Sequence, residues 1–427
     1  MTQMLKARAG KITEEMEMVA LQEGYTPEFI RAGVACGKIV IPKNKNRQRS
    51  KICGIGSGLD VKVNGLMGTS GDRDDMAMEV KKLHIIEEAG AHGFMDLSMG
   101  ADIDAMRTLS LEQSNIAAGC VPVYQACKEA AEKRGLMVNM TSDDLFAVVE
   151  KQCQAGMDFM AVHSALNMDV LKILKKTGRI ADVVSRGGSL LTGWMFHNDK
   201  ENPLYAEFDR LLEILKATDT VLSIGDAIRP GANADSLDQV HLRGLMVAGE
   251  LTKRALEAGV QVMVEGPGHV PINHIASAML LQKRLCFDVP YYILGFLATD
   301  VAPGYDNITG AIGGAFAGMH GADFLCYLTP AEHLGLPNEE DVRIGVETTR
   351  IAANCANVLK RGGNAWNRDL AMSRARVGRN QEDQVKNAIN QANLIAAFAA
   401  QNPSDGCVVC EDTRCPADVA AEFFGIA

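Results

Sequence analysis

From about residue 60 onward, short apolar segments alternate with longer amphipathic segments, and this alternation restricts the fold more than any other feature of the sequence. The short segments suit buried strands, and the longer ones suit helices, at 74–88, 142–155, 205–217 and 237–258. Strands that alternate with helices pair in parallel, with right-handed connections. Nine segments are predicted strands: 61–67, 93–97, 119–123, 158–162, 182–184, 221–224, 261–264, 291–297 and 323–327.

Eight strand–helix units close a barrel, so the predicted fold is of the α/β class, a (β/α)8 barrel of the TIM type. Nine predicted strands exceed eight, so one of them is misassigned or lies outside the barrel. An open, doubly wound parallel sheet is the alternative architecture. Polar and glycine-rich residues follow most of the predicted strands, as in VSRGG, GDAIRPG, EGPGHVP and LTPAEH. Because the carboxyl ends of barrel strands share one face, these residues predict a ring around one cavity.

The chain is predicted to divide into four parts: a small N-terminal region (1–57), the catalytic barrel (58–335), a C-terminal helical segment (336–401) and a cysteine-rich tail (402–427). Outside the barrel, helical patterns cover 12–23, 27–36, 339–360 and 381–401. The basic loop at 43–51 is most simply a solvated surface, and phosphate binding is the alternative.

The chain has 427 residues with 43 lysines and arginines against 53 aspartates and glutamates, a formal net charge of −10. An acidic protein repels phosphate backbones, which argues against nucleic acid as the main partner. The sequence has no run of 18 uncharged apolar residues and no secretory pattern at its start, so we expect a cytoplasmic protein without membrane contact. The eleven cysteines are an odd number without an export signal, which argues against a disulfide framework.

Three of the cysteines lie close together in the tail, at Cys407, Cys410 and Cys415. Three soft thiolates at this spacing suit either an iron–sulfur cluster or zinc. A structural zinc site needs four ligands, and no fourth cysteine or histidine lies nearby in the sequence, although the tail could borrow one from elsewhere. Three ligands on a [4Fe-4S] cluster leave one iron open to a small molecule.

Two histidines are placed like metal ligands. His269 follows a rigid Gly-Pro-Gly turn near Glu265, and His333 follows Glu332 directly. Both come after predicted strands, so both are expected to point into one barrel mouth, where neighbouring carboxylates favour metal binding. The alternative is that each is an ordinary structural histidine.

Two further strand ends carry arginine beside glycine, in Ser185-Arg186-Gly187-Gly188 and in Asp226-Ala-Ile-Arg229. Glycine lets the backbone approach an anion, and arginine can hold it with a fork of donors, so both segments predict phosphate recognition. A tight turn with a surface arginine is the alternative for the first. Three other polar residues at strand ends could bind a polar substrate or be core residues: Tyr124, His163 and Tyr292.

Four long segments resemble one known family: VSRGGSLL, VQVMVEGPGHVP, ATDVAPGYDNITGAIGGA and ADFLCYLTPAEHLGLP. With the tail cysteines, they make the chain similar almost end to end to the radical S-adenosylmethionine (SAM) family of phosphomethylpyrimidine synthase, which makes the thiamin pyrimidine. The resemblance implies a (β/α)8 barrel, SAM, a [4Fe-4S] cluster, and a divalent metal, usually zinc. It also implies 5-aminoimidazole ribotide as substrate, a one-electron donor, and a homodimer in which each tail covers its partner's barrel mouth.

The resemblance also implies roles for individual residues. His269 and His333 match divalent-metal ligands, and Cys407, Cys410 and Cys415 match the cluster ligands. It leaves proton transfer open among three of the substrate-contacting positions, His163, Glu265 and Tyr292. All ten substrate-contacting positions are Met95, Tyr124, His163, Ser185, Arg186, Gly187, Asp226, Arg229, Glu265 and Tyr292.

The chain departs from the thiamin pattern around the expected pocket. Leu66 stands where the thiamin enzymes place a substrate-contacting asparagine, and the tail reads VVCEDTRC. Further replacements are Met99, Ala227 and Phe296 for threonine, glycine and proline. The pattern resembles the paralogous 5-hydroxybenzimidazole synthases, which act on the same ribotide in anaerobic cobamide (vitamin B12) lower-ligand biosynthesis. We therefore expect this radical SAM lyase activity, with phosphomethylpyrimidine synthase as the alternative.

Two other classes of function are compatible with the residues alone. A zinc-dependent barrel lyase or hydrolase would use the tail as a structural zinc site. A non-catalytic protein would bind the ribotide or SAM without forming 5′-deoxyadenosine. Iron and sulfide content separates the first from a radical enzyme, and product analysis separates the second.

Overall fold

The computed structural model describes residues 1–361, 363–400 and 416–425. The chain divides into two compact units, Met1–Ala365 and Trp366–Ala427. The first contains a closed barrel of eight parallel strands in the order β10-β3-β4-β5-β6-β7-β8-β9. The barrel strands are β3 (Lys62–Met67), β4 (Gly93–Asp96), β5 (Ala117–Cys120), β6 (Phe159–Val162), β7 (Val221–Ile224), β8 (Val262–Gly266), β9 (Tyr291–Ile293) and β10 (Phe324–Cys326). The predicted (β/α)8 barrel is confirmed, and the open sheet is excluded.

Helices connect successive strands and cover the outside of the barrel. They are α4 (Met76–Glu88), α5 (Ile103–Glu112), α6 (Pro122–Arg134), α7 (Ser142–Ala155), α8 (Met168–Thr177), α9 (Arg186–Asn198), α10 (Pro203–Ala206), α11 (Phe208–Thr218), α12 (Gln239–Ala258), α13 (Ile272–Leu285), α14 (Asp306–His320) and α15 (Glu339–Arg361), with short 3₁₀ turns η1 (Met137–Asn139) and η2 (Asn233–Asp235). Helix α7 has the bounds predicted for it, 142–155, because its ends are well marked. Thr141 and Asp144 form a capping box at its start, and Gly156 ends the helix with φ 109°.

The ninth predicted strand, 182–184, is wrong. These residues form a loop between α8 and α9, and 45% of Val184 is exposed, so the segment has no sheet partner. The predicted strand 119–123 also runs too far, because Pro122 begins helix α6 instead. The predicted strand 291–297 ends early, at Ile293.

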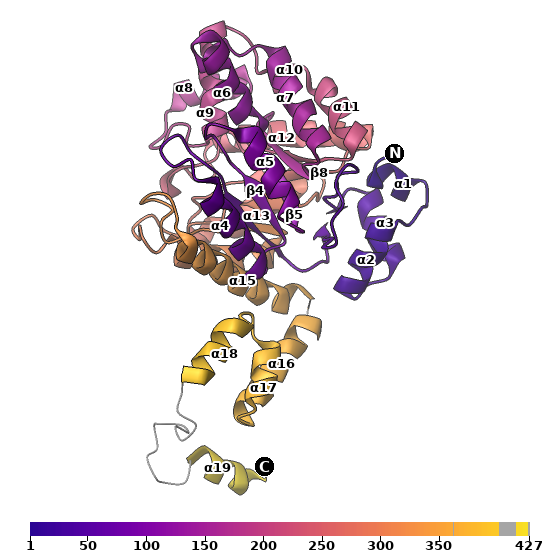
Figure 1. Ribbon diagram of the computed structural model, residues 1–427, viewed down its shortest axis with the longest axis vertical. Coiled ribbons are helices and arrows are strands. Elements are labelled where there is room, and N and C mark those ends of the chain that lie inside the picture. The colour runs from indigo at the N-terminus through magenta and orange to yellow at the C-terminus, as the bar shows by residue number, and fades with distance from the viewer. Residues whose placement is uncertain (362, 401–415, 426–427) are drawn as a thin grey trace. The chain divides into compact units, whose positions relative to one another are not determined.

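The N-terminal helices have a small core of their own beside the barrel. These are α1 (Gln3–Arg8), α2 (Glu14–Glu23) and α3 (Pro27–Ala35), followed by the paired short strands β1 (Ile39–Val40) and β2 (Ile55–Gly56). The three helices group together in Figure 1. Their buried apolar side chains form a cluster separate from the barrel core, whereas Val40 on β1 and Ile55 on β2 pack into the barrel core. Helix α1 was not predicted.

The second unit is helical in its described residues. It holds α17 (Gln381–Asn387), α18 (Gln391–Ala400) and α19 (Pro416–Phe424), and α16 (Gly363–Val377) leads into it. The single helix predicted at 381–401 is therefore broken between α17 and α18, and α16 was missed. Cys407, Cys410 and Cys415 lie outside the described residues.

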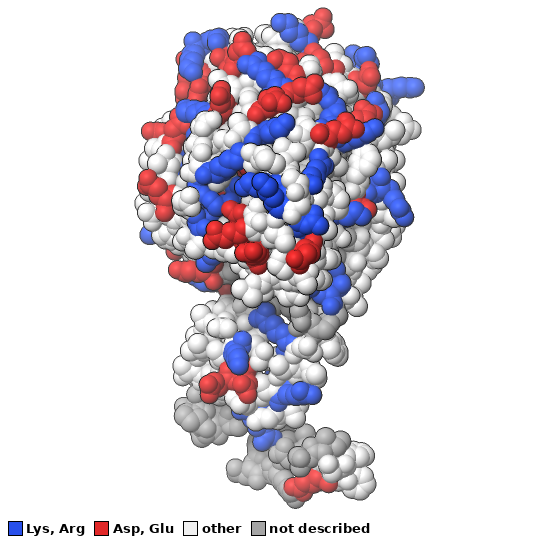
Figure 2. All heavy atoms as spheres, turned by 90° about the vertical axis from the view of Figure 1, so that its right-hand side faces the viewer, with Lys and Arg blue, Asp and Glu red and all other residues white. Residues whose placement is uncertain are grey.

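Acidic and basic side chains are interspersed across the upper part of the face drawn in Figure 2. This mixture of signs differs from the basic stripe that a nucleic-acid-binding surface presents. Among the helices of residues 1–361, 363–400 and 416–425, none is both long and apolar enough to cross a membrane.

The basic loop at 43–51 is only partly the solvated surface that the sequence suggested: five of its nine residues are exposed, but Asn44 and Arg47 are buried. The carboxylate of Asp158, which directly precedes β6, accepts hydrogen bonds from the Asn44 amide nitrogen (2.9 Å) and from Arg47 Nη1 (2.6 Å). Asp158 and Asn44 are fully buried, and only 5% of Arg47 is exposed. The loop therefore fixes the amino-terminal end of the barrel, opposite the predicted active-site face.

Replacing Asp158 with alanine is expected to lower the free energy of unfolding by about 3–5 kcal/mol, because it leaves the Arg47 charge buried without its partner. Urea unfolding measures this change. The control is Asp169→Ala, which removes an exposed pair with Lys172 and is expected to cost less than about 1 kcal/mol. An equal loss of unfolding free energy in the two variants would contradict a structural role for the loop.

Candidate active site

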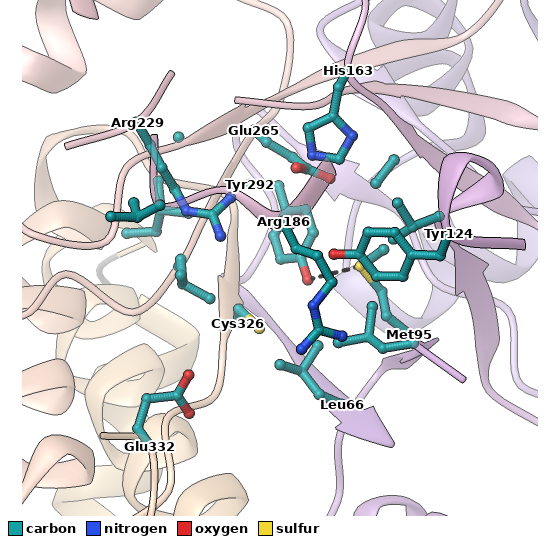
Figure 3. A pocket seen from close by; sticks show the side chains of 17 residues that line it. Leu66, Met95, Tyr124, His163, Arg186, Arg229, Glu265, Tyr292, Cys326 and Glu332 are labelled. Atoms are coloured by element: carbon teal, nitrogen blue, oxygen red, sulfur yellow. Dashed lines mark hydrogen bonds between the residues drawn. The ribbon is translucent and has the colours of Figure 1, made fainter. Parts of the chain in front are cut away.

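A cavity of about 310 Å³ lies at the carboxyl ends of the barrel strands. All eight strands, or the loops that follow them, contribute to its wall. Seven of the ten predicted substrate contacts line it, as Figure 3 shows: Met95, Tyr124, His163, Arg186, Arg229, Glu265 and Tyr292. The other three do not line it: Ser185 and Gly187 flank Arg186 in the sequence, and Asp226 lies beside Glu265. The predicted ring of polar strand ends therefore surrounds one cavity.

Two guanidinium groups give the cavity its positive charge. Arg186 is the first residue of α9, and Ser185 caps this helix by accepting a hydrogen bond from the Gly188 amide nitrogen at 3.2 Å. The Arg186 guanidinium lies 5.4 Å from the centre of the Tyr124 ring. Arg229 enters from the loop after β7. A helix N-terminus with two arginines nearby favours an anionic group such as a phosphate.

His163 is held in a narrow slot formed by two glycines. A Cβ atom on Gly187 would lie 2.3 Å from the imidazole, and one on Gly225 would lie 3.1 Å from it. Burial, together with the positive charge of Arg229, lowers the pKa of His163 to about 3. The imidazole is therefore neutral at pH 7, and its buried Nδ1 has no hydrogen-bond partner among the described residues.

Replacing Gly187 with alanine is expected to weaken binding of the substrate by at least about tenfold, because the new methyl group displaces the His163 ring and a displacement of about 1 Å in a site is costly. Calorimetric titration with 5-aminoimidazole ribotide, the substrate that the family resemblance implies, measures the affinity. Gly193→Ala on the same helix is the control, because its Cβ would meet only Val138 at 3.9 Å. Unchanged affinity in Gly187→Ala would mean that the His163 slot is not part of the binding site.

Glu265, on β8, is the acidic group of the cavity. Ser223 Oγ on the neighbouring strand β7 donates a hydrogen bond of 3.0 Å to its Oε1. Burial raises the pKa of Glu265 to about 7, although Arg229 opposes this shift. Burial also raises the pKa of Asp226, which lies in the loop after β7. Glu265 can therefore exchange a proton near neutral pH.

Tyr292, on β9, is fixed by residues of two other strands. Asn64 Nδ2 on β3 donates to the Tyr292 hydroxyl at 2.8 Å, and this hydroxyl points to Met95 Sδ at 3.5 Å. Burial raises the pKa of Tyr292 well above its usual value, so the phenol keeps its proton. Sequence reasoning missed Asn64 and Ser223, although both lie in predicted strands, because their roles depend on neighbours far apart in the chain.

The two predicted metal-binding histidines lie next to each other, and His333 directly follows Glu332, which lines the cavity. The ring centres of His269 and His333 are 5.4 Å apart. Nδ1 of His269 is 2.8 Å from Asp300 Oδ1, and Nδ1 of His333 is 2.9 Å from Asp306 Oδ1. A carboxylate only accepts, so each Nδ1 carries a proton, and Nε2 of a neutral imidazole in this orientation offers its lone pair to a metal. In the part of the chain that the structure describes, no third histidine, cysteine, aspartate or glutamate joins them in a metal-binding group.

Comparison with known proteins identifies the family of this barrel. A family model described as "Radical SAM ThiC family" matches residues 2–422. The chain belongs to this family. It is therefore a radical SAM enzyme, and SAM and a [4Fe-4S] cluster are its cofactors.

Individual relatives divide into two activities. The chain is 76% identical over 427 residues to a 5-hydroxybenzimidazole synthase of Eubacterium limosum, with all of both chains covered. It is 59% identical over 426 residues to a 5-hydroxybenzimidazole synthase of Moorella thermoacetica, again with full coverage of both. It is 51% identical to a phosphomethylpyrimidine synthase of Desulforamulus reducens, covering 100% of this chain and 99% of that protein.

Proposed function

We propose that this radical SAM enzyme is a 5-hydroxybenzimidazole synthase. It converts 5-aminoimidazole ribotide to 5-hydroxybenzimidazole, with release of formate and phosphate, and so supplies the lower ligand of anaerobic cobamide (vitamin B12) biosynthesis. The observation that carries the proposal is the identity of 76% to one such synthase over the full length of both chains, against 51% to a phosphomethylpyrimidine synthase.

The cavity wall supports this choice of product. Leu66, which replaces the expected asparagine of the thiamin enzymes, lines the cavity on β3. The replacement removes an amide donor and acceptor and leaves an apolar surface beside Met95 on β4. Fewer polar contacts at this side leave the ribotide fragments free to rearrange into a different ring.

Arg186 and Arg229 are proposed to hold the phosphate of the ribotide. Both guanidinium groups line the cavity, and the α9 N-terminus adds unpaired backbone N–H donors between Ser185 and Gly188. Electrostatic clamps of this kind position a substrate before any bond breaks. The Arg186 guanidinium lies over the Tyr124 ring, and this cation–π contact helps to hold the arginine in place.

Among the three candidates for proton transfer, Glu265 fits best. Its pKa of about 7 lets it release or accept a proton at Oε1 or Oε2 under working conditions. His163 stays neutral and Tyr292 keeps its proton, so we propose that these two bind and orient the substrate.

The cluster and SAM would supply the difficult chemistry, the one-electron reduction of SAM that yields methionine and a 5′-deoxyadenosyl radical. We propose Cys407, Cys410 and Cys415 as the cluster ligands, a separate one-electron donor, and a homodimer in which each tail serves its partner's barrel. The described cysteines are free thiols, which suits a reducing compartment, so we place the enzyme in the cytoplasm.

His269 and His333 are proposed to hold a divalent metal, with zinc as the first candidate. Two imidazoles, each oriented by a carboxylate, match the usual surroundings of a metal-binding histidine. Water or substrate would complete the coordination, since catalytic zinc sites keep an open position. A bound metal here would polarise a substrate oxygen or nitrogen.

Replacing His269 with alanine is expected to remove most of the bound zinc from the purified protein. Atomic emission spectrometry of anaerobically purified protein measures the zinc content. His84→Ala, an exposed histidine on α4, is the control. If zinc content is the same in both variants, the assignment of this site is wrong.

The proposed function is tested by anaerobic turnover with 5-aminoimidazole ribotide, SAM and dithionite, with products identified by mass spectrometry. We expect 5-hydroxybenzimidazole and 5′-deoxyadenosine, and neither without SAM. Formation of 4-amino-5-hydroxymethyl-2-methylpyrimidine phosphate instead would assign the chain to thiamin biosynthesis.

A further inference from the structure

Asp300 connects two parts of the site that are far apart in the sequence. Its Oδ1 lies 2.8 Å from Nδ1 of His269, and its Oδ2 accepts a hydrogen bond of 2.7 Å from the backbone nitrogen of Asn233. Asn233 is the first residue of η2, so Asp300 satisfies a backbone donor that this turn leaves free. One carboxylate therefore contacts a candidate metal ligand and the β7–α12 loop at the same time.

The β7–α12 loop, residues 225–238, is the loop that carries Arg229. It is fixed at its two ends by Arg179, which donates to the Ile228 carbonyl oxygen at 2.7 Å and forms a forked pair with Asp238. Between these anchors, the Asp235 carboxylate accepts hydrogen bonds from the backbone nitrogens of Ile180 (3.0 Å) and Ala181 (2.9 Å), and Asp300 holds Asn233. Loss of the Asp300 contact would free Asn233 and its neighbours, while Arg179 and Asp235 keep the loop attached.

We infer that Asp300 is a positioning residue through which metal binding at His269 orders the Arg229 loop. The inference rests on the divalent-metal site of the proposed function. A metal held by Nε2 would withdraw electron density from the imidazole and make its Nδ1–H a stronger donor, which would fix the Asp300 carboxylate. A fixed Oδ2 then holds the Asn233 amide, and with it the loop that presents Arg229 to the substrate.

Asp306 provides a matched comparison. It orients His333 just as Asp300 orients His269, but its other oxygen accepts a longer hydrogen bond, 3.3 Å, from Gly304 and not from the Arg229 loop. Loss of either carboxylate should weaken zinc binding by about 10–100-fold. Only in the variant that lacks the Asp300 carboxylate should metal binding no longer order residues 226–238.

The test is hydrogen–deuterium exchange of peptides covering residues 226–238 in the full-length protein, with and without zinc and without SAM. Zinc affinity is first measured for each variant by competition with a chromophoric chelator, so that zinc is saturating in every sample. We expect zinc to slow exchange in this loop by about fivefold or more in the wild type and in Asp306→Ala, a typical coupling between two sites. In Asp300→Ala we expect no change on adding zinc.

Zinc protection of the loop that persists in Asp300→Ala, or that is absent from the wild type at saturating zinc, would overturn the inference. Asp300→Asn is the second variant; its single side-chain carbonyl oxygen cannot accept both hydrogen bonds, so it should also lose the coupling while preserving shape. Failure of the wild type to bind zinc would instead remove the metal site of the proposed function, and the inference with it. Ribotide titration provides the second measurement: saturating zinc should tighten ribotide binding less in Asp300→Ala than in the wild type and Asp306→Ala, because only the direct contact between metal and substrate remains there.

Discussion

Replacing Cys410 with alanine is expected to abolish formation of 5′-deoxyadenosine, to below about one thousandth of the wild-type rate. Cys407, Cys410 and Cys415 are the proposed ligands of the [4Fe-4S] cluster, and the two thiolates left in the variant would not retain it against loss of iron. Without the cluster, no electron reaches SAM, and the chemistry that only the cofactor supplies is absent. Liquid chromatography of anaerobic reactions with dithionite measures 5′-deoxyadenosine directly.

The barrel should remain folded in this variant, because the tail lies outside the barrel segment of the sequence. Thermal unfolding and ribotide binding check this point. Cys355→Ala is the matched control, since Cys355 is an exposed free thiol on α15 and not in the tail. Retained 5′-deoxyadenosine formation in Cys410→Ala would remove Cys410 from the cluster.

The barrel was predictable because its signal is periodic and local. Each buried strand is a short apolar run, each covering helix has one apolar face, and caps such as Thr141 and Gly156 mark the ends. The errors arose where local patterns agree with more than one environment. The run at 182–184 is apolar enough for a strand. The other eight strands close the barrel among themselves, however, and leave no free edge with which this run could pair.

The basic loop at 43–51 shows a second limit. A run of lysine and arginine usually faces water, yet Arg47 is buried because Asp158, more than 100 residues later in the chain, supplies its charge partner. No local sequence pattern predicts such a pairing. The same reason explains why Asn64, Ser223 and Asp300 were not predicted: each acts through a partner on a different strand or loop.

The sequence predicted that the cavity lies at the strand ends, but it did not predict the protonation states of the residues in it. Seven of the ten expected substrate contacts line one cavity, because parallel strands deliver their carboxyl ends to one face. Which of His163, Glu265 and Tyr292 exchanges protons depends on burial and on the nearby Arg229 charge, and these appear only in three dimensions.

Replacing Glu265 with glutamine is expected to lower the rate of product formation by about 100-fold or more, the usual contribution of a group that transfers protons. Glutamine keeps the shape and can still accept the Ser223 hydrogen bond, but it cannot exchange a proton near neutral pH. The wild-type rate should change with pH around 7, and this inflection should be missing from Glu265→Gln. Rates measured from pH 5.5 to 8.5 with saturating ribotide and SAM provide the comparison.

Stability provides an independent check that does not depend on turnover. The pKa of Glu265 is about 7 in the folded protein, above its ordinary value of 4.5, so the folded state holds a proton that the unfolded state has released. The contribution of Glu265 to the free energy of unfolding therefore falls as pH rises from about 4.5 to about 7, and stays lower above that range. The difference in unfolding free energy between wild type and Glu265→Gln should follow this course, because other titrating groups, such as Asp219, are common to both proteins. A difference that is constant across this range would show that Glu265 is already ionised in the folded protein, and the proton-transfer role would then pass to another group.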